Sequence, residues 1–111
     1  MMINQQLHDE VMRLHAQVCG GLADPTRILI LYSVSEQPRS VGDLAKILEI
    51  SQPTASRHLQ NLRDRGLVNG TREGQNVFYA LADPRIIQAL DLLRAVLSDN
   101  LSRQASLAEK V

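Results

Sequence analysis

Residues suited to reading DNA bases gather at the start of a predicted helix that begins after Ser51. Glutamine can form paired hydrogen bonds with adenine, arginine can do so with guanine, and a threonine methyl group can contact the thymine methyl group. An arginine here can instead bind phosphate, which fixes register without reading sequence. The first two turns carry Gln52, Thr54, Ser56 and Arg57. They predict direct DNA contacts, and the alternative is an ordinary solvated helix face.

A second polar cluster occupies the turn between two predicted strands. Glycine and asparagine favour turns, so Gly74 and its neighbours also suit an ordinary hairpin. The arginine at the base of the hairpin favours phosphate or minor-groove contact. With two further polar residues of the preceding helix, the predicted DNA-binding set is Gln52, Thr54, Ser56, Arg57, Asn61, Arg63, Arg72, Gln75 and Asn76.

Four potential metal ligands recur along the first predicted helix. His8, Met12, His15 and Cys19 are spaced by 4, 3 and 4 residues, which puts them within about 60° on one face of an α-helix. Such ligands suit zinc, nickel or copper. One helix can present His15 and Cys19 together, but His8 lies about 10 Å from His15 along the helix axis. A site would therefore need ligands from a partner chain. Three readings stay open: a transition metal bound across a dimer, redox sensing by Cys19, and packing without sensing.

Several other classes of function are disfavoured by the sequence. His58 has no acidic or thiol neighbour at ligand spacing, so a hydrogen-bonded structural histidine or a phosphate donor is preferred to a metal ligand. No nucleophile has an adjacent base and no phosphate-binding loop is present, so we do not expect an enzyme. One cysteine excludes an internal disulfide and a zinc site with two thiolates from one chain.

The composition fits a single domain that covers residues 1–111. With only three aromatic residues, the core should consist of Leu, Ile, Val and Ala, as in helical folds. Positive charge gathers where DNA contact is expected: residues 51–79 hold four arginines against two acidic residues, and residues 1–24 hold one against three. No apolar run approaches the roughly 18 residues of a membrane helix, and no signal pattern is present. We expect a soluble, cytoplasmic protein without membrane partners.

The order of predicted elements is that of a mainly α fold with a small β-hairpin wing, a winged helix-turn-helix. Asp24-Pro25 and Asp83-Pro84 each predict a helix start, since Asp caps free amides and Pro suits the first helical position. Gly20-Gly21 should end the first helix. The predicted ranges are an N-terminal dimerisation helix at 1–21, a helix-turn-helix at 40–66, a wing at 67–81 and a C-terminal dimerisation helix at 83–108.

The first and last helices carry more apolar residues than one small domain can bury. This excess predicts a homodimer formed through both helices. Two-fold symmetry would place the two recognition helices about 34 Å apart, on successive major-groove faces. Such a dimer favours an inverted-repeat operator.

Three segments of the chain resemble the ArsR/SmtB family of bacterial transcriptional repressors: LADPTRILIL, SQPTASRHLQNLRDRGLV and REGQNVFYAL. The resemblance runs from about Leu22 to Leu93. The family's S-x-x-S-x-H-L-x-x-L-x-x-x-G-L-V segment corresponds to Pro53–Val68, with Ser56, His58, Leu59, Leu62 and Gly66 in place. Its R-x-G-x-x-x-x-Y wing resembles Arg72 to Tyr79. The resemblance implies a homodimeric repressor that an effector, often a metal ion or a thiol oxidant, releases from its operator.

The chain departs from the family at its sensor sites. Many members carry a C-x-C pair before the recognition helix, and residues 40–44 here contain no cysteine. Others bind metal between the last helices through acidic residues and histidines, but no histidine follows His58. We therefore expect no metal at the usual family sites. The remaining candidates for an effector site are His8, His15 and Cys19.

Together these features predict a sequence-specific DNA-binding transcriptional regulator, in the form of a repressor that binds double-stranded promoter DNA and responds to an effector. One alternative is a winged-helix module that docks on proteins, although the polar, arginine-bearing helix favours DNA. Another is a metal-storage or metal-transfer protein that ignores DNA.

Overall fold

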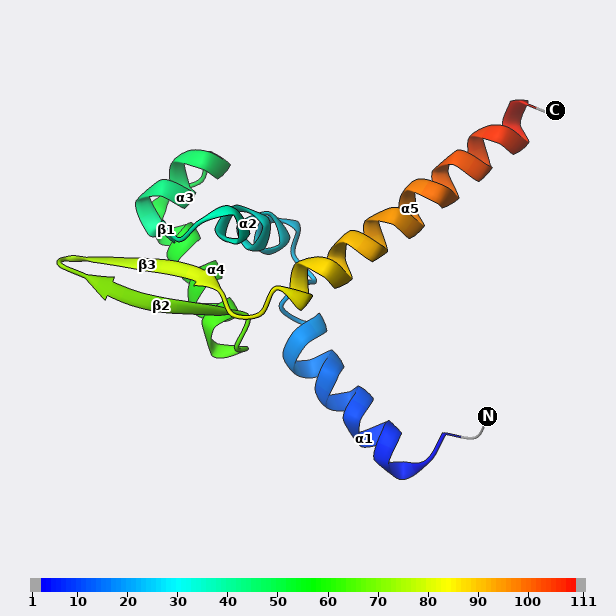
Figure 1. Ribbon diagram of the computed structural model, residues 1–111, viewed down its shortest axis with the longest axis horizontal. Coiled ribbons are helices and arrows are strands. Elements are labelled where there is room, and N and C mark those ends of the chain that lie inside the picture. The colour runs from blue at the N-terminus through cyan, green and yellow to red at the C-terminus, as the bar shows by residue number, and fades with distance from the viewer. Residues whose placement is uncertain (1–2, 110–111) are drawn as a thin grey trace.

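A computed structural model describes residues 3–109 as a small core from which two helical arms and a β-hairpin project (Figure 1). The predicted domain also included residues 1, 2, 110 and 111, which lie outside the described residues. The elements are α1 (Gln5–Arg13), the π-helical segment η1 (Leu14–Cys19), α2 (Pro25–Glu36), β1 (Arg39–Ser40), α3 (Val41–Leu48), α4 (Gln52–Asp64), β2 (Val68–Glu73), β3 (Asn76–Leu81) and α5 (Arg85–Glu109).

Side-chain caps fix the starts of the first four α-helices. Asp24 accepts a hydrogen bond from the Thr26 amide at 2.8 Å, and Pro25 occupies the first helical position, as predicted. Ser40 and Asp43 form a reciprocal capping box at α3. The Asn4 side chain accepts from the Leu7 amide at the start of α1, and the Ser51 side chain accepts from the Thr54 amide at the start of α4. These bonds satisfy amides that have no partner within the helix.

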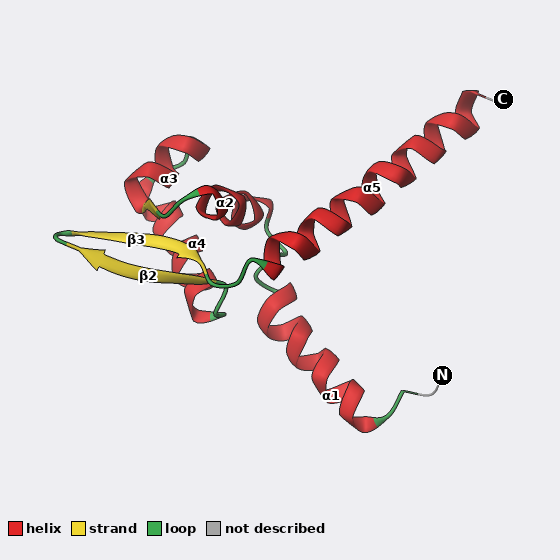
Figure 2. Ribbon diagram, viewed as in Figure 1, coloured by secondary structure: helices red, strands yellow, loops and turns green. Residues whose placement is uncertain are grey.

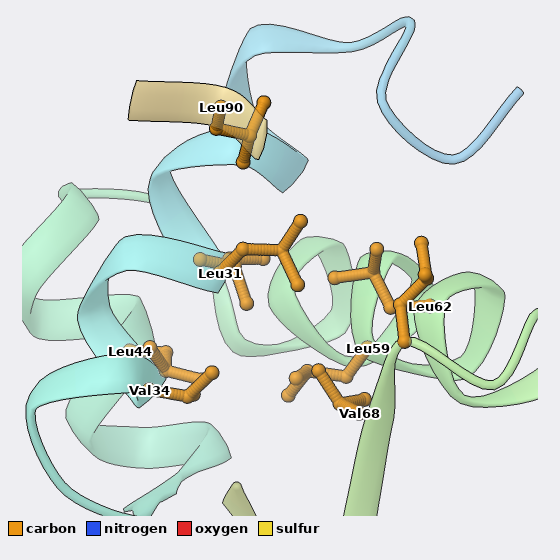
Figure 3. Close-up of a cluster of buried hydrophobic side chains, with 9 residues drawn as sticks. Leu31, Val34, Leu44, Leu59, Leu62, Val68 and Leu90 are labelled. Carbon is orange, nitrogen blue, oxygen red and sulfur yellow. The ribbon is translucent and has the colours of Figure 1, made fainter. Parts of the chain in front are cut away.

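The core is entirely apolar and lies where α2, α3, α4 and the first residues of β2 meet (Figure 3). Its largest fully buried side chains are Ile30, Leu31, Leu44, Leu59, Leu62 and Val68. The helix that starts at Asp24-Pro25, α2, contributes Ile30, Leu31 and Val34 to this core. From α5, only Leu90 is buried. The core therefore holds the helix-turn-helix firmly and leaves most of the two arms outside.

The helices of the helix-turn-helix end in the same type of backbone turn. At α4, the amides of Gly66 and Leu67 donate to the carbonyls of Arg63 and Leu62, and Gly66 adopts a φ of 76°. At α3, the amides of Glu49 and Ile50 donate to Lys46 and Ala45 in the same pattern. This arrangement needs one left-handed residue. Glycine supplies it after α4, but Glu49 supplies it after α3, with a φ of 55°.

The wing is an antiparallel hairpin with a third, very short strand added (Figure 2). β2 and β3 pair from Val68 with Leu81 to Glu73 with Asn76, and Gly74 opens the two-residue turn with a φ of 64°. The predicted wing at 67–81 corresponds closely to this hairpin. β1, which pairs Arg39 with Tyr79, was not predicted because two residues carry no alternation pattern.

The arms make the molecule much more extended than a compact domain. The radius of gyration is 17.4 Å, compared with about 13 Å for a globular chain of this length. α1 and α5 diverge from the side of the core opposite the wing tip (Figure 1). Their exposed large apolar residues include Val11, Met12 and Leu14 in the first arm and Leu93, Leu97 and Leu101 in the second. Within residues 3–109, no helix has the length and apolarity needed to cross a membrane.

The first arm is not the continuous α-helix that its residue spacing predicted. α-Helical geometry ends at Arg13, and the chain widens into a π-helix up to Cys19. Asn4 caps the arm, so the helix starts at Gln5, inside the predicted N-terminal segment 1–21. Gly20-Gly21 does end the arm. The physical reason for the π-helix lies in the contacts that its carbonyl groups make with α4, described below.

We expect a Glu49→Gly substitution to stabilise the protein. A left-handed residue other than glycine costs about 1–2 kcal/mol, and the greater freedom of glycine in the unfolded chain returns about 0.4–1 kcal/mol of that. The free energy of unfolding in urea should therefore rise by about 0.5–1 kcal/mol. Lys46→Gly, in a right-handed exposed position of α3, is the control and should destabilise by about 1 kcal/mol. A loss of stability in both variants would contradict the prediction.

Candidate nucleic-acid interface

The recognition helix α4 divides into an apolar face and a polar face. Ala55, Leu59 and Leu62 point into the core and are fully buried. Around the axis of a regular helix, at about 100° per residue, Arg57 lies about 160° from the centre of this apolar stripe. Its side chain is exposed, with one hydrogen bond of 3.4 Å to the Thr54 hydroxyl. The guanidinium group is therefore free to reach a ligand outside the protein.

Three of the predicted DNA-binding residues share one flank of α4. Gln52, Ser56 and Arg63 fall within about 40° of one another around the helix axis, and all three are exposed. An amide, a hydroxyl and a guanidinium group thus form a row along the helix. Such a row supplies both donors and acceptors for base edges and donors for phosphates.

Thr54 and Asn61 lie on the opposite flank of α4 and are half-buried. The Thr54 hydroxyl accepts a 2.8 Å hydrogen bond from Ser51 within the helix cap. The Asn61 side-chain oxygen accepts a 2.9 Å hydrogen bond from Nε of Arg65. Both groups already take part in intramolecular hydrogen bonds. The structure therefore does not bring them together with Gln52, Ser56 and Arg63.

The wing turn and the start of α4 line the same groove. It has a volume of about 340 Å³ and is bordered by Gln52, by Gln75 and Asn76 of the turn, and by Gly42 at the start of α3. Arg72, opposite Val77 in the hairpin, is exposed. The two polar clusters found in the sequence therefore combine into one surface that runs from the recognition helix to the wing.

His58 is held by intramolecular contacts. Its Nδ1 lies 3.4 Å from Nη1 of Arg27 in a half-buried position. Asp24 is nearby: the hydrogen bond from the Thr26 amide lowers the pKa of its carboxyl group, and the charges of His58 and Arg27 lower that pKa further. This arrangement is a structural one, on the side of α4 that faces α2.

Arg27 and Arg65 form a site that the residue patterns did not reveal. Arg27 donates to the carbonyl oxygens of Gly20 and Gly21 at 3.2 and 2.9 Å. Arg65 donates at 2.6 Å to the carbonyl of Ala16, which precedes the two glycines by one helical turn. The glycine pair was the available signal, because two adjacent glycines also permit close approach of a side chain. The prediction for Gly20-Gly21 was limited to the end of the first helix.

The predicted stripe on the first arm is exposed but not regular. His8, Met12, His15 and Cys19 are all exposed. The spacing of about 100° per residue does not apply to His15 and Cys19, which belong to the π-helix. Among residues 3–109 of a single chain, no group of three or more His, Cys, Asp or Glu side chains is placed to hold a metal ion.

Comparisons with known proteins agree with this architecture. A family profile described as bacterial regulatory protein, arsR family, matches residues 24–70. The probable mercury resistance operon repressor of Streptomyces lividans is 37% identical over 85 residues, which cover 77% of this chain and 68% of the relative. The chain belongs to the ArsR family. The resemblance seen in the sequence is thereby confirmed, as is the winged helix-turn-helix fold.

Two further similar proteins bear on function. The transcriptional activator HlyU of Vibrio cholerae is 40% identical over 73 residues, covering 66% of this chain and 68% of HlyU. A homodimeric winged helix-turn-helix DNA-binding domain from Mycobacterium bovis, described as a possible ArsR-family transcriptional regulator, superimposes with a TM-score of 0.75 at 28% identity. That alignment covers 91% of this chain and 94% of the domain. The protein is a DNA-binding transcriptional regulator, not an enzyme.

We expect the Arg57→Ala variant of this ArsR-family protein to bind its DNA about 1–3 kcal/mol more weakly. Fluorescence anisotropy at several salt concentrations separates the two roles of the arginine. Loss of a phosphate contact makes the negative slope of log K against log salt shallower by about 1 and preserves specificity. Loss of a base contact reduces discrimination against a scrambled duplex. Arg103→Ala, which removes an equal charge from the distal part of α5, is the control, and unchanged affinity for Arg57→Ala would remove Arg57 from the site.

Proposed function

We propose that the protein is a homodimeric repressor that binds an inverted-repeat operator and prevents transcription from it. The observation that carries this proposal is the pairing of a polar, exposed α4–wing surface with two arms that expose large apolar residues within residues 3–109. One surface supplies DNA contacts, and the arms supply the two-fold symmetry that an inverted repeat requires.

The second arm is built so that its apolar face continues beyond the core. Leu97 and Leu101 lie within about 20° of buried Leu90 around the helix axis, yet they are 57% and 55% exposed. The base of α5 is fixed on α2: the Tyr32 hydroxyl donates to Asp91 at 2.6 Å, and Arg94 stacks on the Tyr32 ring at 5.2 Å. Partial burial and the bond to Asp91 raise the pKa of Tyr32.

The proposed DNA contacts follow from the arrangement of the exposed groups. Arg57 lies outermost on α4, and Gln52, the first residue of the row on one flank of α4, borders the groove shared with the wing. Thr54 and Asn61 are left out, because their polar atoms already have partners within the chain. The proposed set is Gln52, Ser56, Arg57, Arg63, Arg72, Gln75 and Asn76.

The proposal is tested by fluorescence anisotropy of the full chain on DNA from upstream of its own gene. The reduced protein is titrated with chelator present, against a scrambled duplex of equal length and at fixed salt. Specific binding with two chains per duplex is the expected result. Equal, weak affinity for both duplexes would favour a protein-docking module instead. Stoichiometric metal uptake without DNA binding would favour metal storage or transfer.

Introducing a charge into the proposed interface should separate the two chains. We expect Leu97→Glu to weaken the dimer by at least about 2 kcal/mol, because a carboxylate would be buried without a partner, and to weaken operator binding with it. Ala95→Glu adds the same charge about 160° away around the helix and should leave the dimer intact. Analytical ultracentrifugation measures both. An intact Leu97→Glu dimer would rule out α5 as the interface.

The effector is proposed to act on the first arm, close to where it meets the core. The mercury resistance repressor among the relatives suggests a metal, and the His8, His15 and Cys19 side chains are suitable donors. Since one chain does not group three such ligands within the described residues, a metal would have to bridge the two subunits. Cys19, which is exposed immediately before Gly20, is the alternative target, as a thiol open to oxidation.

A Cys19→Ala substitution distinguishes the two effector hypotheses. If the thiol is the sensor, the variant should bind DNA normally and lose its response to peroxide. If a bridging metal is the sensor, His15→Ala should reduce the response to added zinc as strongly as Cys19→Ala does. DNA release is followed by anisotropy in both cases. A full response of Cys19→Ala to each agent would exclude Cys19 from sensing.

A further inference from the structure

The first arm is attached to the core by an arginine at the end of the recognition helix. Nη1 of Arg65 donates to the carbonyl oxygens of Ala16 at 2.6 Å and Gln17 at 3.1 Å. Nε of the same side chain donates to Asn61 within α4. The Gln17 side-chain amide donates in return to the Arg65 carbonyl at 3.5 Å. One half-buried side chain therefore links η1 with α4.

These two carbonyl groups are available because the helix is wound as a π-helix at this point. The Gly20 amide donates to His15, five residues earlier, and the Gly21 amide donates to Val18, three residues earlier. In an α-helix the same two amides would donate to Ala16 and Gln17. The altered pattern passes over both oxygens, and the Arg65 guanidinium takes the place of the missing donors. The positive charge at this carbonyl-rich helix end is also electrostatically favourable.

The two glycines leave the space in which Arg65 lies. A Cβ atom on Gly20 would come within 2.6 Å of Nη1 of Arg65. A Cβ atom on Gly21 would come within 2.9 Å of both Cδ of Arg65 and Cδ1 of Leu67. Gly20 has ordinary right-handed helical angles. Its lack of a side chain is therefore a requirement of this contact rather than of the backbone conformation.

Arg27, from α2, contacts the same junction between the first arm and the core, residues 16–21, which is called the joint below. Its Nε and Nη2 donate to the Gly21 and Gly20 carbonyls, while its Nη1 lies against His58 of α4. The joint is thus fastened on one side to the recognition helix and on the other to a core helix. Movement of the first arm relative to α4 requires breaking at least the two Arg65 contacts.

We propose that Arg65 is a positioning residue that sets the half-site spacing accepted by the dimer. The proposal rests on the dimeric function proposed above. In a dimer joined through its arms, the angle between arm and recognition helix determines how far apart, and in what rotational phase, the two recognition helices lie. Arg65 fixes that angle without touching DNA. Lysine cannot replace it, because an ammonium group lacks the rigid fork that reaches Ala16, Gln17 and Asn61 together.

The test uses a duplex that the wild-type chain selects from a random library. Three DNAs are compared at fixed salt by fluorescence anisotropy: a single half-site, the selected duplex, and the same duplex with two base pairs inserted at its centre. The insertion rotates one half-site by about 70° relative to the other. Wild-type protein should prefer the selected spacing by about tenfold or more.

The Arg65→Ala variant should bind the single half-site within about twofold of wild type, while its preference for the selected spacing falls to about twofold or less. Gly20→Ala should behave in the same way, because its Cβ atom displaces the intact Arg65 guanidinium. Arg57→Ala provides the contrast: its half-site affinity should fall and its spacing preference should persist. Circular dichroism verifies folding, and Gly20→Ala carries the test if Arg65→Ala does not fold.

Two results would overturn the proposal while leaving the proposed function intact. Retained spacing preference in both Arg65→Ala and Gly20→Ala would show that the joint does not set the spacing. Weakened half-site binding by Arg65→Ala, with normal behaviour of Gly20→Ala, would make Arg65 a phosphate contact. If the wild-type chain instead binds no selected duplex as a dimer, the proposed function fails, and the role of Arg65 fails with it.

Discussion

Hydrogen bonds from two arginines to the backbone around Gly20 and Gly21 determine how the first arm is placed relative to the rest of the molecule. The core would fold around its leucines and isoleucines whether or not these bonds were made. The direction in which the arm leaves the core depends on them, together with the packing of Val18 and Leu22 against the core. Arg27 and Arg65 come from different helices, so the joint also ties α2 and α4 to the same segment of backbone.

The residues that stabilise the fold differ from the residues suited to DNA contact. The stability of the fold comes from an apolar centre that contains no buried polar side chain among the described residues. Groups suited to DNA lie on the outer side of α4 and on the wing, where they do not disturb that centre. The apolar surface that the centre cannot cover is confined to the arms, on the side away from the wing tip (Figure 1). Each surface can therefore vary without loss of the others.

Local patterns in the sequence predicted most of the fold because its signals are local. Ser40 with Asp43, Ser51, and the two Asp-Pro pairs act within one helical turn, and the inward positions of Leu59 and Leu62 follow from helical periodicity. The π-helix and the hydrogen bonds from Arg65 to the Ala16 and Gln17 carbonyls could not be predicted in this way. They depend on a contact between residues nearly fifty positions apart, and neither composition nor spacing encodes such a contact. The same limitation applies to the hydrogen bond between Asn61 and Arg65, because only the tertiary structure fixes the orientation of this arginine.

The exposed apolar residues along α5 make operator binding depend on the concentration of subunits in the cell. If the operator-binding unit is the dimer, then dimerisation, folding of the distal helix and DNA binding are linked by mass action. Below the dimer dissociation constant, the amount of dimer varies with the square of the subunit concentration, so a twofold change in abundance becomes about a fourfold change in binding-competent protein. Residues such as Leu97 and Leu101, which touch neither DNA nor effector, would then set the cellular protein level at which the operator changes from vacant to occupied.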